Sequence, residues 1–580
     1  MPKVLPDKCS VLIVGGGPCG LMLANELGRR GVSAVLVDQK PDTAFNPQAN
    51  ATQARTMEHF RRLGFADEIR SLGLPPNFPT DIAYFTRYAR HELARFKLPS
   101  SREATERIRR LSGSWSAAEL PHRVSQKLVE RVLRRHAELL TGISVHYGWR
   151  LVRFTDNGDG VEAEIECVSD GTTQTIRAAY LVGADGPRST VRQALGFGYF
   201  GQEGAVRDFF GGRMYAIYLR APHFYRAVPH GPAWMNVTFN RERRAFMAAV
   251  DGCGEFAFHT QLRSQEQEDD ITQSGAASLF QAAVGAPIDV EILSRGTWTA
   301  GYALVAEQFQ RGRVFIAGDA AHLFTPAGGL GYNTAIEDAV NLGWKLAAAV
   351  RGGAGPGLLA SYEAERQPIA ERNTRFARLF ADSLGLFAPV PEIEDETLAG
   401  EQARRDAGAY LGAHGKAEFD IPGVTFGGRY DGSPTIVGDG TSPPPDEANA
   451  YVPSACPGGR APHLWLSDAH SLYDLFGFEW TLLRLSRSDE GLPLADAAFA
   501  AGMKLKVLDL PSGDLRDLYE ADLVLIRPDQ IVAWRGNTTD APEKIVAQVL
   551  GFGPAPSNIA GRVGASAYAA NVAPAGGGPS

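Results

Sequence analysis

VLIVGGGPCGLMLANELGRRGVSAVLVD, residues 11–38, is the stretch of sequence that decides the fold. It begins with an apolar run of strand length, residues 11–14, which ends in glycines. Residues 21–30 then place apolar side chains at helical spacing, and Gly31 follows as a stop signal. A second apolar run, residues 34–37, ends in the acidic Asp38. Strand, glycines, helix, strand and acid in this order predict a βαβ unit.

The glycines of this unit have the GxGxxG spacing of a dinucleotide-binding turn. Gly15 permits the tight turn, Gly17 lets a pyrophosphate approach the backbone, and Gly20 lets helix and strand pack closely. The helix N-terminus faces the phosphates, and Asp38 can accept hydrogen bonds from ribose hydroxyls. This turn alone does not separate FAD from NAD. The cofactor contacts predicted here are Gly15, Gly17, Pro18, Gly20, Asp38 and Gln39.

Two further motifs place an acid directly after a buried strand. GADGPRSTVR, residues 183–192, contains Asp185 between glycines, and RVFIAGDAAH, residues 313–322, contains Asp319. Asp319 can hold a ribitol hydroxyl, so these two acids favour FAD over NAD. The loop PAGGLGYN, residues 326–333, leads into a helix whose N–H groups can stabilise a negatively charged reduced flavin. The contacts predicted from this loop are Gly329, Leu330, Gly331, Tyr332 and Asn333.

The composition is that of an ordinary globular enzyme, with 44% hydrophobic and 21% charged residues. A net charge of -8 disfavours nucleic acid and anionic membranes as partners, because their phosphates would be repelled. The five cysteines include no CxxC pair, which disfavours a zinc site and favours a reducing compartment. No apolar run approaches the roughly 18 residues that span a membrane. We therefore expect a cytoplasmic protein with no nucleic-acid or membrane partner.

The three motifs together resemble the signature set of single-component (group A) FAD-dependent aromatic hydroxylases, the p-hydroxybenzoate hydroxylase and phenol hydroxylase family. The likeness is strongest over residues 318–345, clear over 8–385 and fainter to 550. Residues 55–58 match the helix that follows the second strand in the phenol 2-monooxygenase-like branch. Arg123 and Gln126 match the family's flavin-contacting pair. The resemblance therefore adds Arg55, Arg123 and Gln126 to the predicted cofactor contacts.

The resemblance implies a two-stage oxidation of an aromatic compound. NADPH or NADH, bound transiently, reduces FAD, and O2 then forms a flavin C4a-hydroperoxide that hydroxylates a phenolic or related ring. The cofactor carries the chemistry and the protein positions it. The implied partners are a small aromatic substrate, O2 and NAD(P)H.

The fold class that we predict is α/β, with a Rossmann-like FAD-binding domain interrupted by an antiparallel-sheet substrate domain. Residues 208–262, rich in aromatic and β-branched residues, favour that sheet. A thioredoxin-like domain follows in the branch that this chain resembles. Since Cys456 lacks a CxxC partner, we interpret this domain as structural or as part of a homodimer interface. The expected ranges are 1–80, 116–200 and 301–400 for the FAD-binding domain, 81–115 and 201–300 for the substrate domain, 401–425 for a helical connection, 426–552 for the thioredoxin-like domain and 553–580 for a flexible tail.

Two residues depart from the family pattern. Gln48 stands where many relatives have an arginine that holds the FAD phosphates, and it can donate hydrogen bonds but no charge. We count Gln48 as a contact and expect Arg55 or Arg123 to compensate. Asn50 stands near the position where some relatives deprotonate the phenol. A phenol with a pKa near ~10 would then need another base or a lower intrinsic pKa.

The substrate pocket is expected on the inserted sheet. Arg213 and Tyr215 are the preferred catalytic residues, because relatives use tyrosine or arginine from this sheet, and Pro326 joins them from the glycine loop. Two alternatives stay open. One is epoxidation, oxidative decarboxylation or Baeyer–Villiger oxidation of an aromatic polyketide on the same scaffold. The other is a flavin-bound binding protein without turnover.

Overall fold

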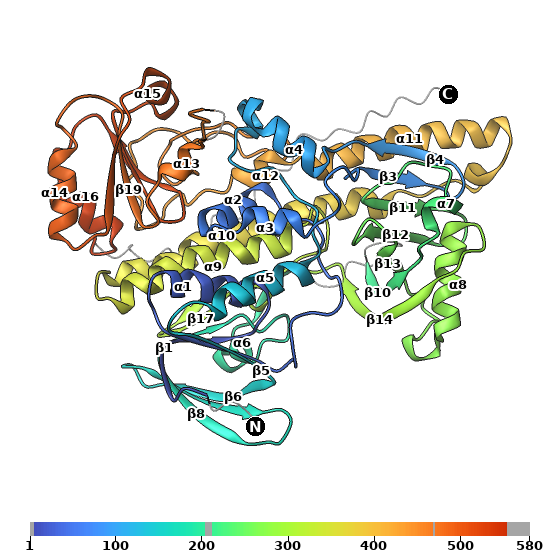
Figure 1. The fold of residues 1–580 in the computed structure, drawn as a ribbon, viewed down its shortest axis with the longest axis horizontal. Helices are drawn as coiled ribbons and strands as arrows, with labels where there is room; N and C mark the ends of the chain where they lie inside the picture. Colours follow the sequence, from blue (N-terminus) through green and yellow to red (C-terminus); the bar gives the residue numbers. More distant parts are fainter. Residues whose placement is uncertain (1–4, 203–210, 468–469, 554–580) are drawn as a thin grey trace.

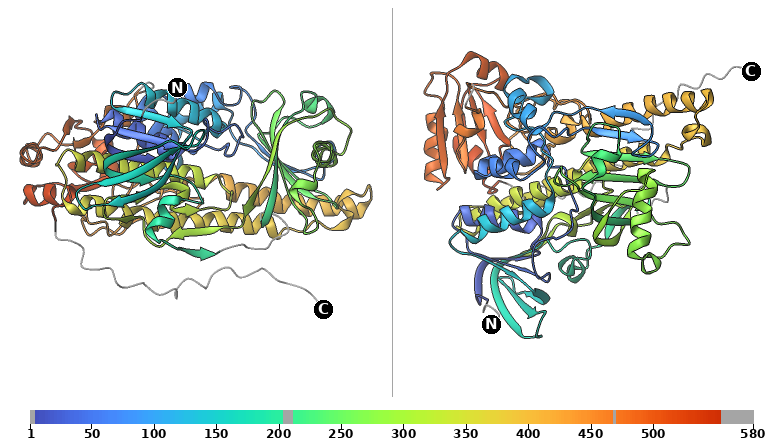
Figure 2. Two further views of the ribbon diagram at one scale, coloured as in Figure 1. Left: turned by 90° about the horizontal axis from the view of Figure 1, so that it is seen from below. Right: turned by 45° about the vertical axis from the view of Figure 1, so that its right-hand side comes forward.

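The computed structural model describes residues 5–202, 211–467 and 470–553 as three lobes around two long helices (Figure 1). No helix in these ranges is long and apolar enough to cross a membrane. The two central long helices are α9 (Leu330–Val350) and α10 (Pro356–Leu386), which pack against each other; a third helix of similar length, α11 (Leu398–Phe419), lies in the substrate lobe. Figure 2 shows α10 running beneath both the FAD-binding lobe and the substrate lobe.

The FAD-binding lobe is built on an eight-stranded sheet. Its main path is β16-β17-β8-β1-β2-β5, with β6 and β7 attached through β8. Strands β1 and β2 pair in parallel, and helix α1 connects them along the chain. The βαβ unit expected at residues 11–38 is therefore confirmed. The strands are β1 (Lys8–Val14), β2 (Ala34–Asp38), β5 (Ile143–Tyr147), β6 (Trp149–Asp156), β7 (Val161–Cys167), β8 (Thr173–Gly183), β16 (Gln310–Arg311) and β17 (Val314–Ile316). The helices are α1 (Pro18–Arg29), α2 (Ala54–Leu63), α3 (Ala66–Ser71), α5 (Gln126–Glu138) and α6 (Thr190–Leu195).

The substrate lobe is a seven-stranded, mostly antiparallel sheet. Its order is β14-β10-β13-β12-β11-β3-β4, and only the β11–β3 pair is parallel. Helix α8 covers its outer face, while α11 packs along β4 (Figure 1). The strands are β3 (Ile82–Phe85), β4 (Glu92–Phe96), β10 (Gly212–Arg220), β11 (Met235–Phe239), β12 (Arg244–Ala249), β13 (Glu255–Gln261) and β14 (Glu291–Ala300). The helices are α4 (Ser101–Arg107), α7 (Phe224–Ala227), α8 (Gln273–Val284) and α11 (Leu398–Phe419).

A small three-stranded sheet joins the two lobes, with order β18-β15-β9. Strand β9 (Tyr199–Gln202) leads toward the substrate lobe, and β15 (Ala303–Ala306) returns from it. Strand β18 (His322–Leu323) follows the motif that contains Asp319. The connections between the two lobes therefore lie close to the predicted flavin motifs.

The C-terminal lobe is a four-stranded α/β domain with strand order β20-β19-β21-β22. Its sheet has one parallel and two antiparallel pairs, with helices packed around it. The predicted fold class, with a separate α/β domain at this end, is confirmed. Its elements are α12 (Pro422–Phe426), α13 (Leu472–Leu475), β19 (Trp480–Arg484), α14 (Leu492–Ala500), β20 (Leu505–Asp509), α15 (Gly513–Tyr519), β21 (Leu523–Ile526), β22 (Val532–Gly536) and α16 (Pro542–Val549).

A buried ionic cluster attaches the C-terminal lobe to the long helices. Glu365 of α10 accepts hydrogen bonds from Lys345 at 2.6 Å and from Arg527 at 2.7 and 2.9 Å. Asn341 and Ser433 donate to the same carboxylate at 2.7 and 2.6 Å. Despite burial, the charges of Arg527 and Lys345 hold the pKa of Glu365 far below its ordinary value. The Glu365 carboxylate is therefore ionised and paired with both cations.

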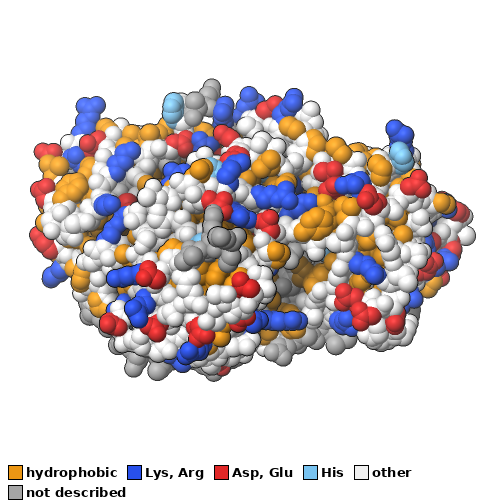
Figure 3. All heavy atoms as spheres, turned by 60° about the horizontal axis from the view of Figure 1, so that its bottom comes forward, with side chains coloured by type: hydrophobic (Ala, Val, Ile, Leu, Met, Phe, Trp, Pro, Cys, Tyr) orange, Lys and Arg blue, Asp and Glu red, His pale blue; other side chains and the backbone are white. Residues whose placement is uncertain are grey.

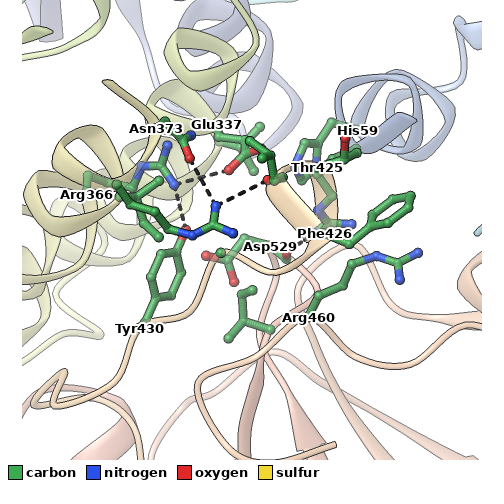
Figure 4. A pocket seen from close by; sticks show the side chains of 16 residues that line it. His59, Glu337, Arg366, Asn373, Thr425, Phe426, Tyr430, Arg460 and Asp529 are labelled. Carbon is green, nitrogen blue, oxygen red and sulfur yellow. Dashed lines mark hydrogen bonds and ion pairs between the residues drawn. The ribbon is translucent and has the colours of Figure 1, made fainter. Parts of the chain in front are cut away.

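A small cavity of about 30 Å³ lies between α10 and the C-terminal lobe (Figure 4). Four arginines line it, and each has a carboxylate partner: Arg55 with Glu58, Arg366 with Asp338, Arg372 with Asp446 and Arg460 with Glu58. A volume of this size holds one or two water molecules and excludes an aromatic ring. The substrate must therefore bind elsewhere.

We expect Glu365→Ala to destabilise the protein strongly. The substitution leaves the buried Lys345 and Arg527 without their shared carboxylate, a change that typically costs about 3–5 kcal/mol. Urea denaturation monitored by tryptophan fluorescence measures the effect. Glu401→Ala is the matched control, because its ion pair with Arg405 is exposed and 3.9 Å long. Exposed pairs contribute about 1 kcal/mol or less, so an equal effect of both substitutions would contradict this account of the interface.

Candidate active site

The dinucleotide turn is fixed by backbone contacts that only glycine allows. Gly15 has a φ of +114°, and a Cβ atom there would lie 2.1 Å from the carbonyl oxygen of Ala184. A Cβ atom on Gly20 would lie 2.0 Å from the carbonyl oxygen of Gly15. In contrast, a Cβ on Gly17 would meet no atom within 4 Å. The turn is thus packed tightly against β8 and open at Gly17, where the predicted pyrophosphate would approach.

Asp38 at the end of β2 is tied to this turn. One carboxylate oxygen accepts a hydrogen bond from the Gly16 backbone N–H at 2.6 Å, and the other accepts from the Lys40 backbone N–H at 2.8 Å. Gln39, the residue between Asp38 and Lys40 in the chain, is exposed. Pro18 takes the first position of α1, where its missing N–H leaves no helical bond unmade. Each carboxylate oxygen has two lone pairs, so Asp38 can still accept from a ribose hydroxyl.

Asp185 and Asp319 lie at the ends of adjacent parallel strands, β8 and β17. One Asp185 oxygen accepts from the Val191 backbone N–H at 3.2 Å, while the other is buried without a partner. Burial raises the pKa of the Asp185 carboxyl, whereas Asp319 is exposed at the surface. Both acids therefore have unused acceptor capacity at the sheet edge where α/β folds bind their ligands.

The glycine loop is clamped to the segment that follows β2. Gly328 and Gly329 have φ values of +63° and +66°. The Asn333 amide donates to the carbonyls of Ala51 at 2.9 Å and Gly329 at 2.6 Å, and its oxygen accepts from the Gln53 N–H at 2.8 Å. Asn333 therefore fixes the shape of the glycine loop. Leu330, Gly331 and Tyr332 form the first turn of α9, directly after this loop.

The remaining predicted cofactor contacts lie on two sides of the molecule. Gln126, at the start of α5, donates to Gln48 at 3.4 Å and to Glu130 at 2.8 Å, beside the loop after β2. Arg55 points away, toward the C-terminal lobe. Its guanidinium donates to Glu58, to the Gln530 side chain at 2.7 Å and to the Asp529 carbonyl at 2.6 Å. Arg55 therefore holds the interface between lobes and cannot replace the phosphate-binding arginine.

An FAD molecule fits the donors and acceptors at this edge of the sheet. The open glycine turn, the two acids with free lone pairs and the N-terminus of α9 match a pyrophosphate, a ribityl chain and a flavin ring respectively. Side-chain oxygens of Asn50 and Ser125 are buried nearby without partners. We assign FAD to this place on these grounds.

One face of the substrate sheet meets the FAD-binding lobe and the other is covered by α8. Arg213 and Tyr215 lie on the face that α8 covers. Tyr215 shares a face with Ile217, whose neighbour Phe258 contacts Phe280 of α8. Arg213 is exposed on the same face and donates to Gln267 at 3.2 Å. The prediction that these two residues contact the substrate is therefore wrong. Alternation along β10 turns both side chains toward α8.

The opposite face of β10 meets the FAD-binding lobe, as Tyr218 shows. Its ring lies 5.8 Å from Phe45, and its hydroxyl accepts from Lys127 of α5 at 2.5 Å. Pro326, at the start of the glycine loop, is exposed. Viewed from below, the surface is hollowed between these two lobes, with hydrophobic side chains inside (Figure 3).

Three residues missed by sequence reasoning occupy this inner face. His259 lies opposite Ala216, stacks on Phe246 at 4.5 Å and accepts a hydrogen bond from Trp298 Nε1 at 3.1 Å. Because Trp298 donates to Nδ1, the imidazole is neutral and carries its proton on Nε2. Burial lowers the pKa of His259 to about 4. In the sequence, the one signal for the placement of His259 is the alternation of side chains along β13.

Comparisons with known proteins agree with this geometry. Residues 8–377 match the FAD binding domain family, and residues 454–552 match the C-terminal domain of aromatic-ring hydroxylases. The FAD-dependent monooxygenase apdD of Emericella nidulans is 32% identical, covering 95% of this chain and 92% of that protein. Phenol 2-monooxygenase of a Pseudomonas species is 30% identical, covering 96% of this chain and 94% of that protein.

Solved structures extend the likeness to the whole fold. RebC with bound 7-carboxy-K252c is 32% identical with a TM-score of 0.85, covering 94% of this chain and 100% of that chain. Aklavinone-11 hydroxylase with FAD and aklavinone is 28% identical with a TM-score of 0.76, with the same two coverages.

Fold and site together define a flavin-dependent monooxygenase. The chain belongs to the group A family of FAD-dependent aromatic hydroxylases, as the resemblance implied. It is therefore an enzyme, and the alternative of a flavin-binding protein without turnover is set aside.

We expect Asp319→Ala to weaken FAD binding by about tenfold or more, the usual loss for a hydrogen bond to a charged group. The carboxylate ends β17 and has free acceptor capacity, so nothing nearby replaces it. The ratio of flavin to protein absorbance after purification measures the loss. Asp159→Ala, in the exposed turn between β6 and β7, is the control. Full FAD content in the Asp319 variant would contradict its assigned role.

Acid should destabilise the protein through its buried neutral histidines. Burial lowers the pKa of His259 to about 4 and that of His122 to about 3. In the unfolded chain these histidines become protonated near pH ~6.5, whereas in the folded state they stay neutral to a lower pH. Stability should fall as pH decreases from ~6.5 to about 4, by about 1.4 kcal/mol per pH unit for each such histidine. His259→Gln should flatten this slope in denaturation curves; a slope equal to that of the unmutated protein would show that His259 is protonated in the fold.

Proposed function

We propose that the enzyme hydroxylates a fused-ring aromatic compound of the polyketide type, using O2 and NADPH or NADH. The observation that carries this proposal is the inner sheet face, where Phe246, His259 and Trp298 form a broad aromatic surface toward the FAD-binding lobe. Relatives named as putative polyketide hydroxylases and aklavinone 12-hydroxylases support it, at 30–33% identity. Three adjacent rings offer more contact area than a single phenol would use, which favours several fused rings.

Each part of the proposed site has a distinct task. FAD, when bound, supplies the chemistry of oxygen activation and transfer. Gly15, Gly17 and Gly20 admit the cofactor's phosphates, while Asp185 and Asp319 accept from its hydroxyls. The backbone N–H groups at the start of α9 face the position where negative charge develops on the ring. The other cofactor contacts predicted from the sequence are retained in the proposal, except Arg55 and Arg123.

The substrate would lie against the inner face of the sheet. His259 Nε2 is free to donate a hydrogen bond to a ring oxygen, because Trp298 occupies Nδ1. Phe246 and Trp298 flank it and keep water from the reacting ring. A proton held on neutral His259 can orient a phenolic or carbonyl oxygen but cannot deprotonate it.

The cell location and the assembly are also proposals. All five cysteines are free and four are buried, which supports a reducing compartment such as the cytoplasm. A homodimer would use an apolar groove between α14 and α16, lined by Ala497, Ala500, Val546 and Phe552. Phe552 is 56% exposed there. Light scattering of the holoenzyme tests the assembly directly.

We expect aklavinone, as a fused-ring probe, to stimulate NADPH or NADH oxidation more than phenol does. With isotope-labelled O2, the product should gain one labelled oxygen and keep its ring system. Mass spectrometry of the product distinguishes this from loss of CO2 or from insertion of oxygen into a ring bond, which would identify one of the alternative oxidations. Equal stimulation by phenol would contradict the fused-ring preference. If the enzyme oxidised neither NADPH nor NADH, the proposed source of electrons would be contradicted.

A further inference from the structure

Arg123 is a buried cation without a counter-ion. The residue is only 5% exposed, and among the described residues its guanidinium makes no hydrogen bond and no ion pair. Its Nη1 atom is fully enclosed without an acceptor. A guanidinium has five N–H donors and stays charged, so burial in this state is costly unless a partner arrives.

The other buried arginines show how unusual this is. Seven have a carboxylate within 4 Å, and Arg192 donates to the Tyr199 hydroxyl and the Pro187 carbonyl. Arg123 has neither kind of acceptor. The seven with carboxylate partners are Arg30, Arg55, Arg366, Arg372, Arg460, Arg527 and Arg535.

Within the part of the chain that the structure describes, the Arg123 charge contacts an aromatic ring of the substrate lobe. Its guanidinium carbon lies 4.1 Å from the centre of Trp234, just before β11. Trp234 is itself 2% exposed, and its indole N–H has no acceptor. Two unsatisfied donor groups therefore lie together, and the same burial lowers the pKa of Arg123 to about 10. A ring face stabilises a cation only partly, so acceptors are still missing.

The ring that Arg123 contacts lies close to the glycine loop. The centre of the Trp234 ring lies 6.0 Å from that of Phe419 in α11. Glu418, the residue before Phe419, accepts a hydrogen bond from the Gly328 backbone N–H at 2.9 Å. The guanidinium therefore lies between the FAD-binding lobe and the substrate sheet, on the side where the glycine loop is held.

We propose that Arg123 binds an anionic oxygen group of the aromatic substrate, in the simplest case a carboxylate. This inference rests on the proposed function and replaces the flavin contact that the family resemblance implied for Arg123. The planar fork with all donors free suits two oxygens held side by side, and Trp234 fixes the plane of the fork.

This assignment also addresses the missing base. Asn50 cannot deprotonate a phenol, and neutral His259 holds its proton. A nearby cation in apolar surroundings favours the ionised form of an acidic substrate oxygen, so the substrate can bind as an anion without a protein base. If the bound oxygen is a phenolate, its charge makes the ring electron-rich; a carboxylate held there would orient the ring without activating it.

The test uses two probes of equal shape, 2-naphthoate and the uncharged 2-naphthamide, titrated into FAD-loaded enzyme and followed by flavin absorbance. We expect the naphthoate to bind more tightly. Arg123→Met should reduce naphthoate affinity by about tenfold to a hundredfold, leave naphthamide affinity unchanged and retain FAD. Arg123→Lys should recover part of the preference, since it keeps the charge but loses the fork.

The matched control is Arg131→Met, which removes the same charge from the exposed surface of α5 and should leave both affinities unchanged. The proposal is overturned if the naphthoate binds no better than the amide, or if it fails to bind at its solubility limit. It is also overturned if Arg123→Met loses FAD or slows flavin reduction without ligand, because the partner would then be the cofactor. Oxygen incorporation into the product tests the proposed function separately, so the two failures are distinguishable.

Discussion

The buried carboxylate of Asp338 is the contact on which the flavin site depends. One oxygen accepts from the Gly318 backbone N–H at 3.0 Å and pairs with His322 Nε2 at 2.6 Å, while the other accepts from Arg366 at 2.7 Å. Burial opposes its ionisation, but the charges facing it from His322 and Arg366 hold the pKa of Asp338 below its ordinary value. Since Gly318 directly precedes Asp319, this carboxylate of α9 sets the end of β17 that meets the cofactor.

The same helix pair transmits this constraint to the C-terminal lobe. Arg366 also donates to the Tyr430 hydroxyl at 3.1 Å, and its neighbour Glu365 receives Arg527 and Lys345. Two consecutive residues of α10 therefore join the flavin motif to the C-terminal domain. Because these bonds are fully buried, moving the domain would expose unpaired charges near the cofactor. The C-terminal domain has no CxxC pair, but it stabilises the positions of α9 and α10 through these buried contacts.

What the sequence allowed us to predict was local, and what it missed depended on distant partners. The βαβ unit followed from periodicity and glycine spacing within 28 residues, 11–38, because its hydrogen bonds and close contacts are made nearby. Arg55 was misassigned because its partners Asp529 and Gln530 lie more than 470 positions away. Tyr215 was misassigned because alternation tells which residues share a face, not which face meets the flavin. The untested cofactor contacts remain predictions for the same reason.

The proposed site would be selective for its substrate because of how charge is distributed around it. On the cofactor side, carboxylates and helix N-termini are arranged around a ligand that carries its own phosphates. The inner face of the substrate sheet instead presents stacked rings and a neutral histidine. Arg123 contacts Trp234, just before β11, and has no paired carboxylate among the described residues. In such apolar surroundings one unpaired cation outweighs many weak contacts, because an uncharged ligand leaves it unsatisfied. Size and flatness would then decide which rings enter, and Arg123 would decide how they are turned toward the flavin.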